Sequence, residues 1–423
     1  MKPIYRLLGA AALGLSLSSG ALADEVLFEN VRVINATEDA SWPGADVLVV
    51  DDRIEAIAEH IEPSDATRVV DGQGHVMTAG FFNAQTQIGA VEIGAVSGTN
   101  DTASANARIT ASFNVSDAFN PATALIPYNR MHGITHGLLV PTTNVSFLAG
   151  TASVIGLGQQ SIEVPKAAMT VTLGEAGSAR SGSSRATTWA LLEEALEDAR
   201  HYRSNRAAYS SGQLRDHALS RRDLAALVPV VNGEMPLLVE VDRASDIRSV
   251  LAMAKSQRVS VILSGAAEGW LIAKEIAEAK VPVIIDPIRN LPTSYEAIGS
   301  RLDNAQLLNE AGVTLLFNGM GWHGTHNAYL VRQSAGNAIA NGLPYHVAVA
   351  AVTRNPAKVF GLKGVGEIKA GAKATIVLWD GDPFEVTTLV KQVMINGVDY
   401  PLISRATRLR DRYFEKWSTR QGQ

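Results

Sequence analysis

The chain begins and ends with short runs of branched apolar residues separated by turn-forming residues. These runs lie at 26–28, 31–34, 47–50 and 54–57 near the start, and a similar pattern returns at 366–379 and 390–396. Runs of this length bounded by Gly, Asn and Asp predict β-strands. Neither end supplies enough strands for a stable sheet by itself. We therefore expect residues 24–77 and 361–400 to form one small β-sandwich domain, followed by a helical tail at 401–423.

The middle of the chain alternates between apolar runs and helical patterns. The apolar runs lie at 237–239, 259–263, 281–285 and 313–317, and the helical patterns at 189–200, 244–256, 270–279 and 304–311. Strand–helix alternation over this length predicts a parallel sheet with helices outside it. An open doubly wound sheet is the alternative, but no Gly-rich dinucleotide turn follows a strand. We expect an α/β fold with a (β/α)8 TIM-like barrel at 78–360.

The first residues have the pattern of a cleavable signal peptide. Lys2 and Arg6 precede an apolar run at 7–17, and Ala21-Leu22-Ala23 provides a small-x-small cleavage pattern. A membrane span needs about 20 apolar residues, so this run is too short for one. A buried N-terminal helix is the alternative. We expect residues 1–23 to be a signal peptide cleaved after Ala23, and the mature protein to be periplasmic or secreted without a membrane span.

Composition excludes several kinds of site and partner. The absence of cysteine rules out a disulfide framework, a thiolate zinc site and a thiol nucleophile. The formal net charge is −5, and removal of Lys2 and Arg6 with the signal peptide makes it −7 (−5 minus 2). No basic cluster remains that would follow a phosphate backbone. We therefore expect no nucleic-acid partner.

Several segments resemble those of a known hydrolase family. Residues 77–87 read Met-Thr-Ala-Gly-Phe-Phe-Asn-Ala-Gln-Thr-Gln. They resemble the opening motif of the amidohydrolase superfamily, where Pro, Gly, two apolar residues, Asp and a small residue precede His-x-His. The exported, imidazolonepropionase-like branch has similar patterns at 117–121, 133–141, 173–175, 243–247, 326–336, 355–357, 366–368 and 380–383. The resemblance covers residues 26–396 and implies hydrolysis of C–N bonds, in cyclic amides or imides or in short peptides.

The residues that the family uses to bind metal are mostly replaced. The resemblance implies one or two divalent ions, normally zinc, held by histidines on strands 1, 5 and 6, a lysine or glutamate on strand 4 and an aspartate on strand 8. Glu175 matches the strand-4 carboxylate. Asn83 stands where the opening motif has its aspartate. The other positions that match metal ligands carry Gln85, Gln87, Glu240, Ser264, Gly265, Asn318 and Gly319. Neutral amides are poor zinc ligands and glycine offers none. We therefore expect no cofactor or metal, and a pocket formed by Gln85, Gln87, Glu175, Glu240, Gly265, Asn318 and Gly319.

Four residues are candidates for remaining chemistry: Glu175, Glu240, Asp242 and His326. Three clustered carboxylates would hold Ca²⁺ or Mg²⁺ through oxygen. Two close carboxylates would instead share a proton and act as acid and base. The remaining alternative is that these carboxylates form ion pairs with Arg180, Arg243 or Arg289. His326 and His323 follow strand 8, where they would bind an ion, contact substrate or cap a loop.

Three hypotheses of function remain open. The first is a non-catalytic binding or scaffold protein, paired with an active relative in a hetero-oligomer or associated with itself. The second is a hydrolase with altered chemistry, acting on a small amide, imide or peptide-like ligand. The third is a structural subunit whose pocket has no ligand. Metal content, and co-purification of a related histidine-bearing hydrolase, would distinguish them.

Overall fold

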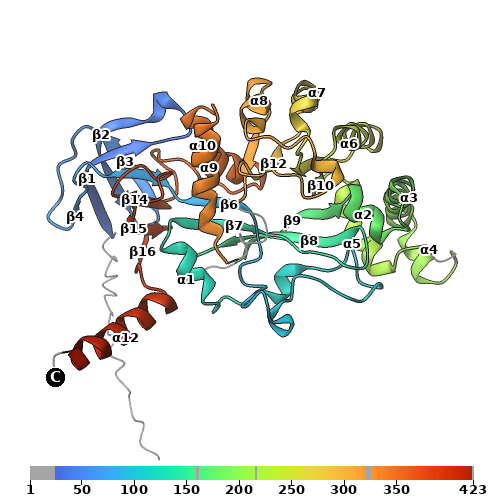
Figure 1. Cartoon of the computed structure of the whole chain (residues 1–423), viewed down its shortest axis with the longest axis horizontal. Coiled ribbons are helices and arrows are strands. Elements are labelled where there is room, and N and C mark those ends of the chain that lie inside the picture. Colours follow the sequence, from blue (N-terminus) through green and yellow to red (C-terminus); the bar gives the residue numbers. More distant parts are fainter. Residues whose placement is uncertain (1–23, 159–161, 215–216, 320–325, 422–423) are drawn as a thin grey trace, which may run out of the picture.

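The computed structural model describes residues 24–158, 162–214, 217–319 and 326–421, although not the side chains at 415, 416 and 418–421. The expected signal peptide and His323 lie outside this part of the chain. Two sheets organise the described residues (Figure 1). One sheet combines strands from both ends of the chain, and the other forms the barrel.

The first sheet joins residues that are far apart in sequence. Its strand order is β16-β15-β14-β5-β1-β2-β3, with β4 paired to β1. The strands are β1 (Glu25–Ile34), β2 (Trp42–Val50), β3 (Arg53–Ala58), β4 (Arg68–Asp71), β5 (Val76–Ala79), β14 (Ile376–Trp379), β15 (Val390–Ile395) and β16 (Val398–Tyr400). The antiparallel pairing of β5 with β14 connects the two chain ends. The sequence prediction of one domain assembled from both ends is confirmed in this respect.

A buried asparagine adds a second link between the two ends of the chain. The side-chain amide of Asn35 donates to the carbonyl of Ile368 at 2.9 Å, and its oxygen accepts from the Ile368 N–H at 2.9 Å. Asn35 is 5% exposed, so both bonds form away from water. One side chain therefore satisfies both backbone groups of a residue at the far end of the chain.

The second sheet runs in chain order around a nearly closed barrel. Its strands are β6 (Phe81–Thr86), β7 (Ile134–Leu139), β8 (Leu148–Gly156), β9 (Ile162–Thr172), β10 (Leu237–Val241), β11 (Val261–Gly265), β12 (Val283–Ile285) and β13 (Leu315–Phe317). The last strand, β13, lies beside the first, β6. The fold is therefore mixed α/β with a TIM-like barrel, as the sequence predicts.

Alternation along the strands places one set of side chains inside the barrel. Leu238, Ile262, Ile284 and Leu316 belong to the interior cluster, while their neighbours in sequence face the surrounding helices. Successive side chains of a strand point to opposite faces, so positions two residues later return to the interior. The same alternation brings Glu240, Ser264 and Asn318 to the end of the barrel where the strands finish.

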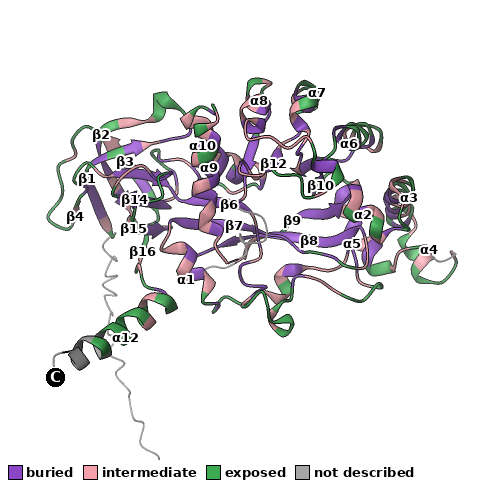
Figure 2. Cartoon of the chain, in the orientation of Figure 1, coloured by how far each residue is buried: buried purple, intermediate pink, exposed green. Residues whose placement is uncertain are grey.

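Helices cover the outside of the barrel from β9 onward. They are α2 (Gly174–Arg180), α3 (Arg185–Ser204), α4 (Arg206–Ser210), α5 (Arg221–Val231), α6 (Ala244–Gln257), α7 (Ala273–Glu278), α8 (Asn304–Glu310), α9 (Val331–Ala340), α10 (Tyr345–Val352) and α11 (Arg354–Val359). Two further helices are α1 (Leu125–Arg130), before β7, and α12 (Arg405–Gln421), in the expected tail. The barrel strands are buried and the outer faces of the helices are exposed (Figure 2).

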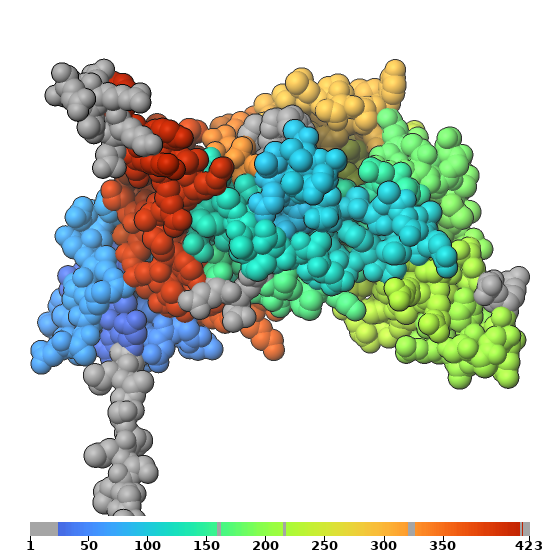
Figure 3. Space-filling model, turned by 90° about the horizontal axis from the view of Figure 1, so that it is seen from below, coloured from blue at the N-terminus to red at the C-terminus, as the bar shows by residue number. Residues whose placement is uncertain are grey.

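The early part of the barrel departs from regular alternation. Strand β8 runs antiparallel to both β7 and β9, and no described helix separates these three strands. All nine residues of β8 are buried. A long loop after β6 occupies the space on this side and spreads across the face seen in Figure 3. Within this loop the carbonyl of Phe113 accepts from the N–H of Thr151 on β8 at 2.7 Å.

Within the described ranges, no helix has the length and apolar character needed to cross a bilayer.

Candidate functional site

A polar cavity lies at the carboxyl ends of the barrel strands. Its volume is about 470 Å³. Its lining combines barrel strands with two loops and the end of α2: Gln85, Gln87, Asn100, Thr102, Val140, Pro141, Thr142, Thr143, Asn144, Thr170, Thr172, Arg180, Leu238, Glu240 and Ser264. The carboxyl end of the strands is where TIM barrels position their functional side chains. We refer to this cavity as the mouth pocket.

Gln85 connects three strand ends across the mouth pocket. Its side-chain oxygen accepts from the hydroxyl of Ser264 at 3.1 Å and from the amide of Asn318 at 3.1 Å. These residues end β6, β11 and β13, which correspond to strands 1, 6 and 8 of the barrel. Because a carbonyl oxygen has two lone pairs, these two bonds use its accepting capacity. Direct hydrogen bonds therefore occupy the oxygen at a position where the family resemblance implies a metal ligand.

A local turn fixes the backbone of Gln85. The side chain of Asn83 accepts from the Gln85 N–H at 3.0 Å and donates to the carbonyl of Ala328 at 2.9 Å. Asn83 is completely buried. The resemblance places an aspartate at position 83, and the amide supplies a donor that an ionised carboxylate lacks. Asn83 thus positions the backbone of the mouth pocket by neutral hydrogen bonds.

Glu240 contributes a carboxylate to the mouth pocket. The hydroxyl of Thr172 donates to its Oε2 at 3.1 Å. Thr172 ends β9, and Glu240 lies on the neighbouring strand β10 in direct register with it. The Glu240 side chain is exposed toward the cavity, so ligand and solvent both reach it.

Asp242 is held by an arginine and does not line the mouth pocket. Arg289 donates two hydrogen bonds to its carboxylate, at 3.0 and 2.9 Å. The N–H of Ala267 donates a third, at 3.1 Å. A bidentate arginine pair of this kind is among the stronger charge-assisted contacts. The ion-pair alternative raised from the sequence therefore describes Asp242.

Gly265 has a conformation that a histidine would not readily adopt. Its φ is +95°, and a Cβ added there would lie 2.6 Å from Oδ1 of Asp242. Residues with a side chain rarely adopt such a φ. The strand-6 end is therefore shaped around the absence of a side chain at this position.

Glu175 lies at the start of α2 and is bound to a neighbouring loop. Its Oε1 accepts from the N–H of Glu296 at 3.0 Å, and its own N–H donates to Oε2 of Glu296 at 2.9 Å. Glu296 also pairs with Arg185 at 2.9 Å. Burial raises the pKa of Glu296, and the Glu175 N–H and Arg185 oppose this increase only in part. The structure places Glu175 outside the lining of the mouth pocket.

Two of the remaining predicted residues, Gly319 and His326, make contacts outside the mouth pocket. A Cβ at Gly319 would lie 2.5 Å from the backbone nitrogen of Val331, so this glycine allows α9 to approach β13. His326 Nε2 lies 3.2 Å from the carbonyl of Glu92, in the loop after β6, and His326 does not line the mouth pocket. Of the predicted site residues, the lining of this pocket contains Gln85, Gln87 and Glu240, and Asn318 joins it through Gln85.

Sequence reasoning did not single out the threonines of the mouth pocket or Asn144 in its lining. Thr170 and Thr172 share the interior face of β9, while Thr142, Thr143 and Asn144 form the loop after β7. The spacing of the two threonines by two residues at a strand end is the signal that would have identified them. The loop residues carry no comparable local pattern.

Two buried polar atoms at this site have no hydrogen-bond partner among the described residues. They are Oγ1 of Thr170, in the pocket lining, and Oδ1 of Asn318, which adjoins it. Buried polar atoms are almost always paired with protein, ligand or ordered water. Both belong to residues at the edge of the mouth pocket, so a small rearrangement of either side chain would let a bound molecule or water complete its hydrogen bonding.

The donor set of the mouth pocket does not fit a divalent metal centre. The described residues include no group of three His, Cys, Asp or Glu side chains arranged to hold an ion. Gln85 is occupied by Ser264 and Asn318, and Asp242 is bound by Arg289. Glu240 remains the single carboxylate of the lining, beside Arg180 and neutral groups, whereas zinc sites normally use several His, Cys or carboxylate ligands.

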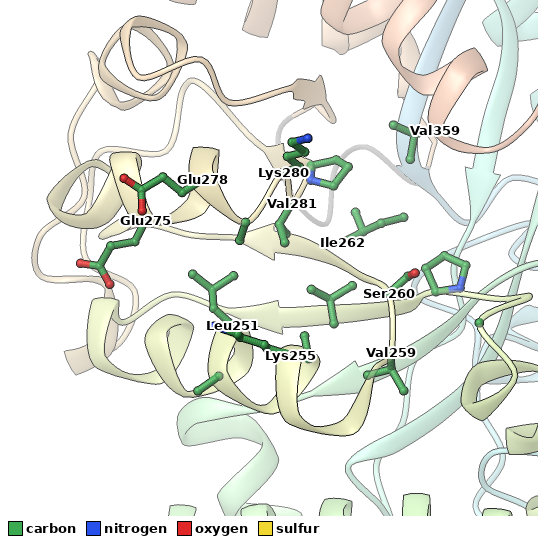
Figure 4. Close-up of a pocket in the computed structure, with 17 residues that line it drawn as sticks. Leu251, Lys255, Val259, Ser260, Ile262, Glu275, Glu278, Lys280, Val281 and Val359 are labelled. Atoms are coloured by element: carbon green, nitrogen blue, oxygen red, sulfur yellow. The ribbon is translucent and has the colours of Figure 1, made fainter.

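A larger cavity lies at the opposite end of the barrel strands. Its volume is about 900 Å³, and α6, α7 and the starts of β11 and β12 surround it (Figure 4). Ser260 and Pro282, which precede these two strands, lie in its lining. Aliphatic side chains dominate its inner surface, and Lys255, Glu275, Glu278 and Lys280 contribute charge. None of the residues predicted from the sequence as site residues lines this cavity.

The composite sheet and the TIM-like barrel together define the amidohydrolase fold. An amidohydrolase from Thermotoga maritima MSB8 has a TM-score of 0.79 and 25% sequence identity, and the match covers 90% of this chain and 100% of that one. An N-isopropylammelide isopropylaminohydrolase from Burkholderia multivorans ATCC 17616 has a TM-score of 0.50 at 15% identity, covering 89% and 98% of the two chains. The second likeness concerns the fold alone.

Part of the sequence also matches an amidohydrolase family model. Residues 243–399 match the model described as "Amidohydrolase family", and the strand-6 and strand-8 ends lie within that match. A stretch of 72 residues is 46% identical to amidohydrolase tasK of Hapsidospora irregularis. That stretch covers 17% of this chain and 7% of the relative, which is a much longer protein.

Proposed function

We propose that this chain is a binding member of the amidohydrolase superfamily that holds a small polar molecule in the mouth pocket without metal-activated hydrolysis. A cavity of about 470 Å³ is suited to a small molecule. The family and its solved relatives act as hydrolases, so a cyclic amide or imide is the proposed ligand class. Such a ligand presents both N–H and C=O groups, which the hydroxyls and amides of the lining can bind.

The observation that carries this proposal is the hydrogen-bonded link from Gln85 to Ser264 and Asn318. The link joins the ends of three strands that would otherwise present metal ligands to the pocket. Unpaired atoms of Thr170 and Asn318 lie beside it. A cavity lined mainly by hydroxyl and amide groups favours binding by hydrogen bonds.

A second candidate function is slow hydrolysis assisted by Glu240. Its carboxylate is exposed in the pocket, within reach of a water molecule that attacks a carbonyl. Arg180 also lines the pocket and would stabilise developing negative charge. The lining contains no second carboxylic acid to protonate the leaving nitrogen, so this reaction lacks one of its usual participants.

We further propose that the protein is exported and acts beside an active relative, for example as a scaffold subunit. The signal-peptide pattern at 1–23 and the resemblance to the exported, imidazolonepropionase-like branch support export. Purification of the native protein with a related histidine-bearing hydrolase would support the partnership.

The test is calorimetric titration of the full chain with succinimide, hydantoin and 2-pyrrolidone, combined with an assay for ring opening. We expect saturable binding of at least one ligand, loss of affinity in Thr172→Val and Ser264→Ala, and no ring opening. Lys255→Ala, in the opposite cavity, is the matched control and should bind as wild type does. Ring opening abolished by Glu240→Gln would favour the second candidate. Equal binding by wild type and Thr172→Val would contradict the assignment to this pocket.

A further inference from the structure

Two histidines, one on α3 and one before α5, lie in direct contact, and neither lines the mouth pocket. His201 is near the end of α3, and His217 precedes α5 (Figure 1). Nδ1 of His201 is 3.2 Å from Nε2 of His217. The other ring nitrogen of His217, Nδ1, is 3.0 Å from Oδ1 of Asp198. Asp198 and His201 are three residues apart on one helix, so both face the same side.

The surroundings hold His217 in one orientation. Its side chain is 5% exposed, and the ring of Tyr209 stacks on it with centroids 5.4 Å apart and an interplanar angle of 9°. Asp198 accepts the proton on Nδ1 of His217, which leaves the Nε2 lone pair directed toward His201. His201 is exposed to solvent. The pair therefore combines one fixed imidazole with one that solutes can reach.

The distance between the two ring nitrogens is close to the separation of two ligands on one metal ion. Metal–nitrogen distances of about 2.0–2.1 Å at a tetrahedral angle place two nitrogens about 3.3 Å apart. A small rotation of the exposed His201 ring would direct both lone pairs to a common point. The carboxylate bound to the far nitrogen of His217 reproduces the carboxylate–histidine–metal arrangement that orients metal-binding imidazoles.

We propose that His201 and His217 form a surface site for a divalent transition metal such as Zn²⁺, Ni²⁺ or Cu²⁺. Asp198 orients His217, and water supplies the remaining ligands. Imidazole nitrogen favours these ions over Ca²⁺ and Mg²⁺, which prefer oxygen. The site is independent of the mouth pocket, because it lies on α3 and the segment before α5 and shares no residue with the pocket lining.

Titration of the full-length protein with Ni²⁺ or Zn²⁺ tests this proposal. We expect one ion per chain for wild type and for His75→Ala, a control histidine away from the pair. Affinity should fall at least tenfold in His201→Ala and in Asp198→Asn, as is typical when a metal ligand or its supporting carboxylate is lost. His201 is exposed, so its replacement should preserve folding, which circular dichroism will verify.

A spectroscopic measurement identifies the ligands directly. With Cu²⁺ bound, electron paramagnetic resonance should show coupling to two imidazole nitrogens in wild type and to one in His201→Ala. Absence of saturable binding by wild type would show that the two histidines form a hydrogen-bonded pair alone. Binding of equal affinity in His201→Ala would place the ion elsewhere. Either result would overturn the proposal.

Discussion

Gly265 shows how a single residue adapts the end of a barrel strand. Its φ of +95° and the proximity of Asp242 both oppose a side chain. The sequence indicated a missing ligand at this position. It did not indicate the reason for glycine, because φ depends on how the strand end meets the Asp242–Arg289 pair. The structure adds that restoring a histidine would require the backbone to move.

We predict that Gly265→Ala lowers the free energy of unfolding by about 2 kcal/mol or more, since backbone strain and a steric clash combine. Gly371→Ala is the matched control. Its φ is +79°, and a Cβ there meets no atom within 4 Å. Strain alone should then cost about 1 kcal/mol. Urea denaturation of both variants measures the difference, and equal losses would show that the Asp242 contact contributes nothing.

Glu163 on β9 makes a contact with His136 on β7 that depends on pH. Its Oε1 lies 3.2 Å from Nε2 of His136, a residue that is 1% exposed. The contact is not aligned as a hydrogen bond. Burial raises the pKa of Glu163, but the interaction with His136 and the charge of Lys373 outweigh burial and leave the pKa below its ordinary value of 4.5.

A lowered pKa in the folded state means that ionised Glu163 stabilises the fold above about pH 4.5. This contribution is lost as the pH falls through the folded-state pKa. We predict that Glu163→Gln is less stable than wild type at neutral pH and that the difference decreases on acidification. Thermal unfolding from pH 7 to pH 3 measures it, with Glu193→Gln on the exposed face of α3 as control. A difference that stays constant with pH would contradict this reasoning.

At the scale of elements, the strand patterns near both ends predicted most of the composite sheet. The predicted runs at 26–28 and 31–34 both lie in the single strand β1, and those at 47–50 and 54–57 correspond to β2 and β3. At the far end, the run at 366–379 contains β14, and the run at 390–396 corresponds to β15. Periodicity cannot reveal which strands become neighbours. The pairing of β5 with β14 depends on contacts between residues almost 300 positions apart, which no local pattern encodes.

Asn35 tests how strongly the two chain ends depend on each other. Asn35→Ala removes the two buried hydrogen bonds to Ile368, which leaves both backbone groups of Ile368 without these partners, and a third bond from the side-chain amide to the carbonyl of Ala40. We predict a loss of about 1–3 kcal/mol in unfolding free energy. Asn337→Ala, which removes an exposed bond on α9, should change it by less than about 0.5 kcal/mol. Similar values for both variants would show that the Asn35 link does not stabilise the composite sheet.

The barrel strands from β10 to β13 were also predictable, because each forms a short buried run followed by a helix. The antiparallel strand β8 was not, since its nine buried residues contain no periodicity that specifies direction. The residues of the mouth pocket likewise include some that the sequence predicted and others that it did not. Positions on strand ends, such as Gln85 and Glu240, followed from the motif order, whereas the loop residues around Thr142 depend on how the long loop after β6 folds.

For the whole molecule, the barrel fold is retained while the interior of its mouth is polar and largely uncharged. Glu240 and Arg180 are the charged residues in the pocket lining. Restoring Gln85 and Gln87 to histidine together would return two ligands but leave Gly265 and Gly319 unable to contribute side chains. The double variant should therefore not acquire tight zinc binding at the mouth pocket.

The zinc content of the purified His201→Ala variant tests the central claim most directly. This substitution removes the proposed surface site, so any zinc that remains after dialysis reports on the rest of the molecule. We predict much less than one zinc ion per chain by elemental analysis, and a melting temperature that a chelator does not change. Close to one zinc ion per chain, with a melting temperature lowered by the chelator, would show that the molecule holds a metal centre apart from the surface site and would contradict the metal-free interpretation.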